Sequence, residues 1–172
     1  MEEKFFFQVL EERRSVRSFN NTEVDKALIK KIIEVCDLSP SAGGLQSFEI
    51  YNVDNTGVKK QIVKAAMDQE FIAEAPVLLV FCANTSRSSQ YGTKAKLFSI
   101  QDATIAASYA QLTASALGLS SVWVGAFNEQ KVSIILGLSD DIIPITLLPI
   151  GYKNEEPQMK ITRGSQIFHE LK

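Results

Sequence analysis

The segment from Leu97 to Asn128 limits the possible folds more than any other, because Asp102 is its only charged residue. Its first two-thirds, from Ser99 to Leu117, is rich in Ala, Ser and Thr and long enough for about five helical turns. A helix without a charged face should be buried nearly all round. We therefore expect a central helix, a candidate to pack against a second subunit, with Gly118 just after its C-terminus.

The other apolar patterns alternate between helices and strands. Strand patterns occupy residues 48–53, 76–82, 121–124 and 142–150, and the continuous apolar run 76–82 predicts a strand buried on both faces. Helical spacing runs up to Arg13, then through a helix capped by Asn21 or Thr22, then through residues 58–65 and 128–137. Residues 86–93 are polar and predict a surface loop. The alternation predicts an α/β fold with some α+β mixing, in one domain spanning residues 1–172.

Composition argues against several classes of protein. The chain has 18 basic and 20 acidic residues, without the basic excess of a nucleic-acid-binding protein. Apolar runs are interrupted before the about 20 residues of a membrane span, and the first residues do not resemble a signal peptide. Cys36 and Cys82 lie in apolar stretches and indicate buried thiols in a reducing compartment. His169 is the only histidine, so we expect no metal site. The reduced thiols indicate a cytoplasmic location.

Residues 13–19, here called the arginine loop, contain three arginines and two serines between two stretches of helical pattern. Guanidinium groups stay charged and present forked donors that fit phosphate. Serine hydroxyls add donors for sugar or ribityl oxygens. A solvated basic turn would have the same composition. The segment is therefore a candidate anion-binding loop for a phosphorylated small molecule.

Residues 39–48, here called the glycine loop, combine Pro40, small polar residues and two adjacent glycines before Phe48. Small residues let backbone N–H and C=O groups approach a flat ligand closely. Gln46 can both donate and accept, as the edge of a heterocycle requires. An ordinary loop after a helix would look similar. The sequence contains no G-x-G-x-x-G and no G-x-x-x-x-G-K, which disfavours a Rossmann or P-loop fold.

Together the two loops resemble the nitroreductase family of FMN-dependent oxidoreductases, in which Arg-x-Ser-x-Arg is followed by Ser-Pro-Ser-Ala-Gly-x-x-Gln. Further similarities are Ala75-Pro76 before an apolar strand, Leu117-Gly118-Leu119 before residues 122–127, and residues 149–152 before a terminal Arg163. The resemblance covers nearly the whole chain in the expected order. It implies a central, mostly antiparallel sheet flanked by helices, in an intertwined homodimer.

The resemblance also implies an FMN site built from two chains. The arginine loop and the C-terminal segment would hold the phosphate, ribityl and pyrimidine oxygens, and the glycine loop would contact the flavin of a partner subunit. A strand end would pass beside flavin N5. For Gln69, a contact to the pyrimidine edge competes with a core or surface role. The residues concerned are Arg13, Arg14, Ser15, Arg17, Pro40, Ser41, Ala42, Gly44, Gln46, Gln69, Val124, Gly125, Ala126, Lys160 and Arg163.

Three further residues receive structural interpretations. Gly44 stands where many members of the family have Asn, so one side-chain contact to the flavin would be missing or replaced by backbone. Trp123 lies within a strand pattern and is expected in the core. Asp102 is interpreted as a charge near a helix N-terminus, where the helix dipole favours it, with a buried ligand contact as the alternative.

The implied activity is that of an FMN-dependent oxidoreductase with a ping-pong mechanism. NAD(P)H would reduce FMN at N5, and an electron-poor small molecule such as a nitroaromatic or a quinone would then replace it. The flavin supplies this chemistry, so no catalytic side chain is required. The alternatives are a same-fold flavoenzyme that acts as a dehydrogenase, dehalogenates or degrades flavin, and a non-catalytic flavin- or nucleotide-binding module. Residues 69–75 and 86–96 are expected to shape the acceptor pocket.

Overall fold

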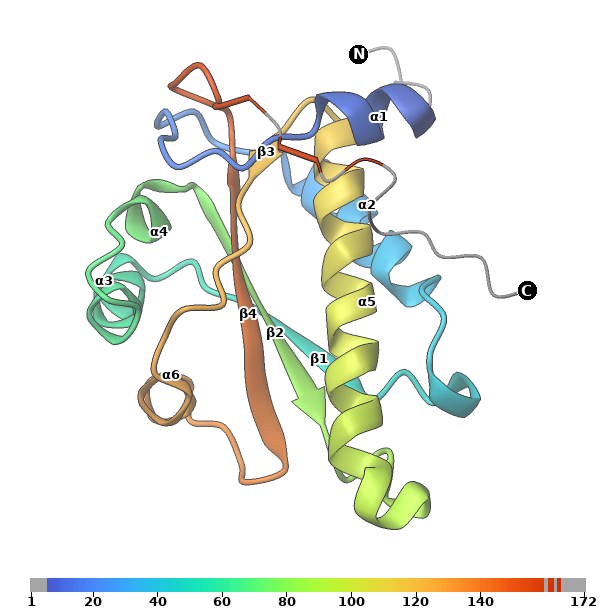
Figure 1. The fold of residues 1–172 in the computed structure, drawn as a ribbon. Helices are drawn as coiled ribbons and strands as arrows, with labels where there is room; N and C mark the ends of the chain where they lie inside the picture. Colours follow the sequence, from blue (N-terminus) through green and yellow to red (C-terminus); the bar gives the residue numbers. More distant parts are fainter. Residues whose placement is uncertain (1–5, 160, 163, 165–172) are drawn as a thin grey trace.

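The computed structural model describes residues 6–159, 161, 162 and 164. In the described part, a four-stranded sheet is packed between helices on both faces (Figure 1). The strands are β1 (Phe48–Asn52), β2 (Val77–Asn84), β3 (Ser120–Ser121) and β4 (Ile142–Gly151). The helical segments are α1 (Phe6–Glu12), α2 (Lys26–Asp37), η1 (Ala42–Gly44), α3 (Thr56–Ala65), α4 (Phe71–Glu74), η2 (Ser89–Lys94), α5 (Ala95–Ala116) and α6 (Glu129–Leu136).

The sheet has the strand order β1-β2-β4-β3, and each neighbouring pair is antiparallel. A single parallel bridge joins Ser15 of the arginine loop to Ser121 of β3. Helices α2 and α5 cover one face, while α3, α4 and α6 lie on the other (Figure 1). The predicted fold class, a mostly antiparallel sheet flanked by helices, is confirmed.

Strand β2 lies at the centre of the core, as its continuous apolar sequence predicts. All eight of its residues are buried. Leu79 and Phe81 pack among the alanines of α5, whereas Leu78 and Val80 pack with residues of α3 and α6 on the opposite face. This division follows from the two-residue period of a strand, which sends alternate side chains to opposite faces.

Helix α5 runs the length of the sheet and packs closely on it through small side chains. Five of its alanines are fully buried (Ala103, Ala106, Ala107, Ala110 and Ala114). The opposite side of the helix is not covered within this chain, since Leu97 is 52% exposed and Tyr109 is 37% exposed. The expectation of burial all round is therefore wrong for the single chain. Gly118 follows the helix in a left-handed conformation, φ 77°, as predicted.

Some predicted boundaries differ from the structure. Asp25 caps α2 through a 2.8 Å hydrogen bond from the Ala27 N–H, so the predicted cap at Asn21 or Thr22 is wrong. The predicted strand 121–124 is reduced to Ser120–Ser121 and an isolated bridge between Val124 and Leu147. Residues within the predicted polar loop 86–93 form part of η2. Trp123 packs partly buried against the core on the α5 side, as expected.

The structure supports a first prediction, which concerns the thiols. Cys36 and Cys82 are buried and unpaired, and burial raises the pKa of each to about 12. At pH 8 we expect no labelling of the native protein by a thiol reagent and two labels per chain after denaturation, because the thiolate is the reactive form. Rapid labelling of the native protein would contradict the burial of these side chains.

The same pKa shift has a consequence for stability. An unfolded thiol ionises near its ordinary pKa of 9.0, while the folded thiol stays protonated up to about 12. A raised folded-state pKa stabilises the fold fully below the unfolded pKa, and this contribution is lost as the pH rises through the folded value. The free energy of unfolding should therefore fall between about pH 9 and pH 12.

No described helix is both long and apolar enough to cross a membrane.

Candidate functional site

The arginine loop is held at the sheet edge by its backbone and two apolar side chains. The Val16 N–H donates to the Ser121 carbonyl at 3.2 Å, and the Asn20 N–H donates to the Tyr152 carbonyl at 3.0 Å. Val16 and Phe19 are buried beneath the loop. Burial of these two residues fixes the segment while Ser15 and Arg17 stay exposed, so the loop presents polar groups on a rigid base.

A cavity of about 220 Å³ lies beside the arginine loop. Three cationic side chains, Arg13, Arg14 and Lys153, line it with one carboxylate, Glu12, and with the segment Gly118–Ser121. Lys153 also pairs with Glu156 at 3.2 Å. The three cations still outnumber these two carboxylates, which favours an anionic ligand. Lys153 was not predicted as a site residue, although it lies shortly after the last strand and next to Tyr152.

The arginines of the loop do not play equal roles. The Arg14 Nη1 donates to the carbonyls of Glu11 and, at 3.1 Å, of Arg13, so this side chain caps the end of α1. The backbone N–H of Arg17 donates to the Glu155 carboxylate. Among the described residues, the guanidinium groups of Arg13 and Arg17 form no ion pair. Arg13 lines the cavity with its donors available, so it is the best candidate for a ligand phosphate.

The predicted flavin-edge residues meet after β3. Val124 exchanges two 3.0 Å backbone hydrogen bonds with Leu147, which occupy both of its backbone polar groups. The N–H groups of Gly125 and Ala126 donate to no backbone acceptor within residues 6–159. The Gln69 Nε2 donates to the Ala126 carbonyl at 3.1 Å. The structure thus joins Gln69 to this segment and places the first free backbone donor at Gly125 rather than at Val124.

The segment before Gln69 is held in an unusual backbone conformation. Met67 and Asp68 both have left-handed φ angles, 57° and 56°, which cost free energy for residues with a Cβ.

Lys59, a buried residue of α3, donates from Nζ to the carbonyls of Ala75 at 2.8 Å and Pro76 at 3.0 Å. Burial lowers the pKa of Lys59. The sequence analysis missed this lysine, because its position in an amphipathic helix pattern predicts an exposed charge.

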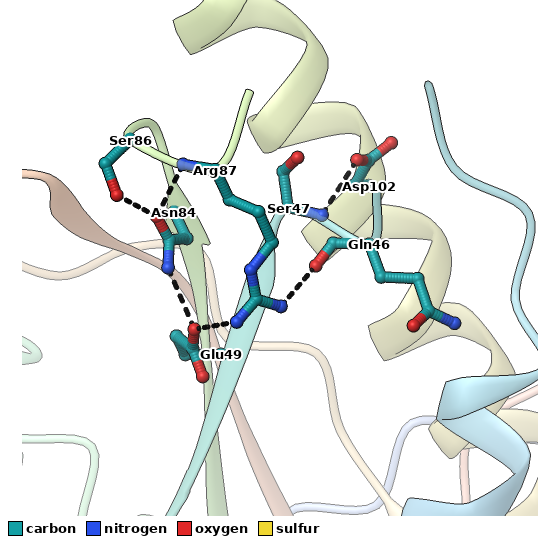
Figure 2. Close-up of polar contacts among 7 residues, drawn as sticks. All are labelled: Gln46, Ser47, Glu49, Asn84, Ser86, Arg87 and Asp102. Atoms are coloured by element: carbon teal, nitrogen blue, oxygen red, sulfur yellow. Dashed lines mark hydrogen bonds and ion pairs between the residues drawn. The ribbon is translucent and has the colours of Figure 1, made fainter. Parts of the chain in front are cut away.

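The glycine loop is fixed by groups from distant parts of the chain (Figure 2). Both carboxylate oxygens of Asp102 accept backbone N–H groups of the loop, from Ala42 at 2.9 Å and from Ser47 at 3.1 Å. Asp102 is 2% exposed and lies inside α5, so its interpretation as a helix N-terminal charge is wrong. Arg87 donates to the Gln46 carbonyl at 2.8 Å. Arg87 therefore belongs to the support of this loop.

One chain does not bring the arginine loop and the glycine loop together. The arginine-loop cavity reaches Ser115 of α5, while the glycine loop borders a second cavity of about 540 Å³ that reaches Asp102. Thirteen residues of α5 separate these two positions, which corresponds to about 20 Å along the helix axis. Pro40, Ser41 and Ala42 line the second cavity. Lys160 and Arg163, the predicted C-terminal contacts, lie outside the described residues.

Comparison with known proteins identifies the family. The nitroreductase family model matches residues 10–70 and 64–152. The chain belongs to the nitroreductase family. It is 30% identical over 166 residues to the FMN reductase (NAD(P)H) of Bacillus subtilis, a match that covers 88% of this chain and 67% of that protein.

Solved nitroreductase structures have the same fold. Nitroreductase A of Vibrio parahaemolyticus superposes with a TM-score of 0.91 at 25% identity, covering 100% of this chain and 77% of that one. An FMN-dependent nitroreductase of Clostridium difficile superposes with a TM-score of 0.83 at 26% identity, covering 96% of this chain and 99% of that one. The second match covers nearly the whole of both chains.

The residues present in this nitroreductase fit FMN. The cavity at the arginine loop offers a cationic surface for a phosphate, and the exposed backbone at Gly125 and Ala126 offers N–H donors without a Cβ at the first position. An added Cβ at Gly44 would meet nothing within 4 Å. There is space for a side chain here, but the left-handed backbone, φ 69°, favours glycine.

Proposed function

We propose that the chain acts as a homodimer that reduces nitroaromatics, quinones or similar electron-poor acceptors with NAD(P)H by a ping-pong mechanism. Its family membership identifies it as an FMN-dependent NAD(P)H oxidoreductase. The observation that carries the proposal is the cationic cavity of Arg13 and Lys153, which is built on the same sheet edge as Ser121 and the free backbone at Gly125. All the described strands belong to one sheet, which supports a single FMN-binding domain.

The side chains of this protein would bind and orient the cofactor. Arg13 and Lys153 would hold the phosphate, with Ser120 and Ser121 beside them, and Gln69 would lie at the pyrimidine edge next to Ala126. When bound, FMN would supply the redox chemistry, by accepting a hydride at N5 and passing electrons to the acceptor. A cytoplasmic location, where thiols stay reduced, suits the two unpaired cysteines.

The position of the glycine loop supports the proposed homodimer. In one chain this loop lies about 20 Å from the arginine loop along α5, so a partner subunit would have to supply it to the same flavin. The surface between α1 and α5 also has apolar side chains to cover, because Phe6 is 63% exposed and Phe7 is 74% exposed. Both features support a site shared between two chains.

We predict an obligate dimer in solution. Obligate interfaces bury on the order of 2,000 Å² or more, so dilution should not produce a stable folded monomer. Light scattering coupled to size-exclusion chromatography, followed over a dilution series, measures this directly. A monomer that retains full flavin content and activity would refute the shared site.

The experiment that tests the proposed function is anaerobic reduction of the purified protein. We expect a yellow protein whose flavin absorption bleaches on addition of NADH or NADPH and returns on addition of a quinone or nitroaromatic compound. Flavin that binds but never bleaches would indicate a non-catalytic binding module. Flavin that bleaches but is not reoxidised by these acceptors would indicate a specialised enzyme of the same fold.

A further inference from the structure

The glycine loop combines an irregular backbone with several side-chain hydrogen bonds. Gly43 and Gly44 have left-handed φ angles of 59° and 69°, and Gln46, which has a Cβ, has φ 48°. A non-glycine residue in this region persists only when its surroundings impose it. The Gln46 N–H donates to the Ser41 Oγ at 2.9 Å, and its Nε2 donates to the Asp37 carbonyl. The loop therefore has one imposed shape.

Asp102 supports this shape from beneath. Its two carboxylate oxygens bind the N–H of Ala42, at the start of the turn, and the N–H of Ser47, at its end. A buried carboxylate is costly unless hydrogen bonds compensate it, and these two charge-assisted bonds are among the stronger kinds available. The only acidic residue of α5 is thus used to fix the two ends of one loop.

Arg87 supports the loop from the other side and is itself fixed. Its Nη1 donates to the Gln46 carbonyl at 2.8 Å, and its Nη2 donates to the Glu49 carboxylate at 2.8 Å. The Asn84 side chain donates to the same oxygen of Glu49 at 2.8 Å and accepts from the backbone N–H of Arg87 at 3.0 Å. Figure 2 shows this chain of contacts from Ser86 to Gln46.

We propose that Asp102 and Arg87 are positioning residues that hold the glycine loop in the shape with which it completes the flavin site of a partner subunit. The inference rests on the proposed function. These contacts attach to the glycine loop and to polar side chains of β1 and β2. Their effect is to hold the backbone of Pro40–Gly44 ready for a ligand, which lowers the cost of ordering it on binding.

The test uses Asp102→Asn in the intact dimer. Asparagine has the same shape but turns an NH2 group toward one of the two backbone N–H groups, so one end of the turn loses its acceptor. We expect the dissociation constant of FMN, measured by fluorescence quenching, to rise at least about tenfold. Arg87→Lys should weaken binding in the same direction, because a lysine cannot bridge Gln46 and Glu49 as a fork.

Two controls separate positioning from a general loss of stability. Ser99 lies one turn earlier on α5, is buried, and donates only to carbonyls of its own helix, so Ser99→Ala should change FMN affinity by less than about twofold. Ile62→Val removes a methyl group from the core on the other face of the sheet. It should lower the thermal midpoint and leave both FMN affinity and the visible circular dichroism of bound FMN unchanged.

The visible circular dichroism of bound FMN is the decisive measurement, because it reports the arrangement of groups around the flavin and not stability. Asp102→Asn saturated with FMN should give an altered spectrum. The inference is wrong if this variant keeps the wild-type affinity and spectrum, or if Ile62→Val changes them equally. Failure of the wild-type dimer to bind FMN would instead overturn the proposed function, and the inference with it, so the wild-type titration distinguishes the two failures.

Discussion

Replacing Gly125 with valine should exclude FMN while leaving the protein folded. An added Cβ at this position would meet only the Trp123 side chain, at 3.6 Å and 3.9 Å, and the backbone lies outside the left-handed region. The chain itself therefore accepts a side chain at this position. The cost falls on a ligand that approaches the free N–H groups of Gly125 and Ala126. We expect loss of most bound flavin with a nearly unchanged thermal midpoint.

Gly137→Val provides the matched control. Gly137 ends α6 in a left-handed conformation with φ 65°, so valine should destabilise the fold by about 1–2 kcal/mol. This residue lies away from both cavities, and the variant should bind flavin normally whenever it is folded. The two variants should therefore give opposite results. Gly125→Val should lose flavin and keep its thermal midpoint, whereas Gly137→Val should keep flavin and have a lower thermal midpoint. Full flavin content and normal reduction by NAD(P)H in Gly125→Val would show that another segment lines the N5 edge.

Replacing Arg13 with alanine should weaken FMN binding at least about tenfold, because a charge-assisted contact to phosphate contributes roughly 1.5–3 kcal/mol. Arg13 lines the cationic cavity and forms no ion pair among the described residues that would compete for its donors. The fold should not depend on it, since Val16 and Phe19 anchor the loop. The dissociation constant of FMN and the flavin content after gel filtration measure the effect.

The control for Arg13 has to be a cation outside both loops. Arg87 is unsuitable, although its polar surroundings in the sequence suggest an ordinary surface loop, because it binds the Gln46 carbonyl. Lys30 is exposed on α2 and, among the described residues, pairs only with Glu34 one turn away. Lys30→Ala therefore removes the same charge at a residue that lines neither cavity. Equal loss of flavin in the Arg13 and Lys30 variants would remove the arginine loop from the binding site.

Local patterns in the sequence were sufficient to predict the main strands and the longer helices. The continuous apolar run of β2 predicts a strand buried on both faces, and the structure buries all eight residues. Gly118 and Gly137 end helices in left-handed conformations, and Asn128 caps α6 by accepting the Lys131 N–H at 2.9 Å. These features depend on a few neighbouring residues, so the order of residue types along the chain is enough to predict them.

Boundaries set by tertiary pairing were less predictable. The strand expected at residues 121–124 pairs with β4 only at its ends, because the chain leaves the sheet between Ser121 and Val124. No local residue type signals that departure. For the same reason, the sequence predicted a helix at 99–117 that is buried nearly all round. Only the packed structure shows which side faces β2 and which stays exposed at Leu97 and Tyr109.

The candidate site, like the fold, was predictable from the sequence only in part. The sequence alone determined the family, the fold class and the two loops, because each loop is a contiguous set of residue types suited to phosphate or to a flat ring. Only the tertiary structure decided that Asp102 and Arg87 support the glycine loop, that Lys153 joins the cationic cavity, and that the two loops lie at different ends of α5. Such contacts join residues far apart in sequence, and their partners are set by how helices and strands pack rather than by local patterns.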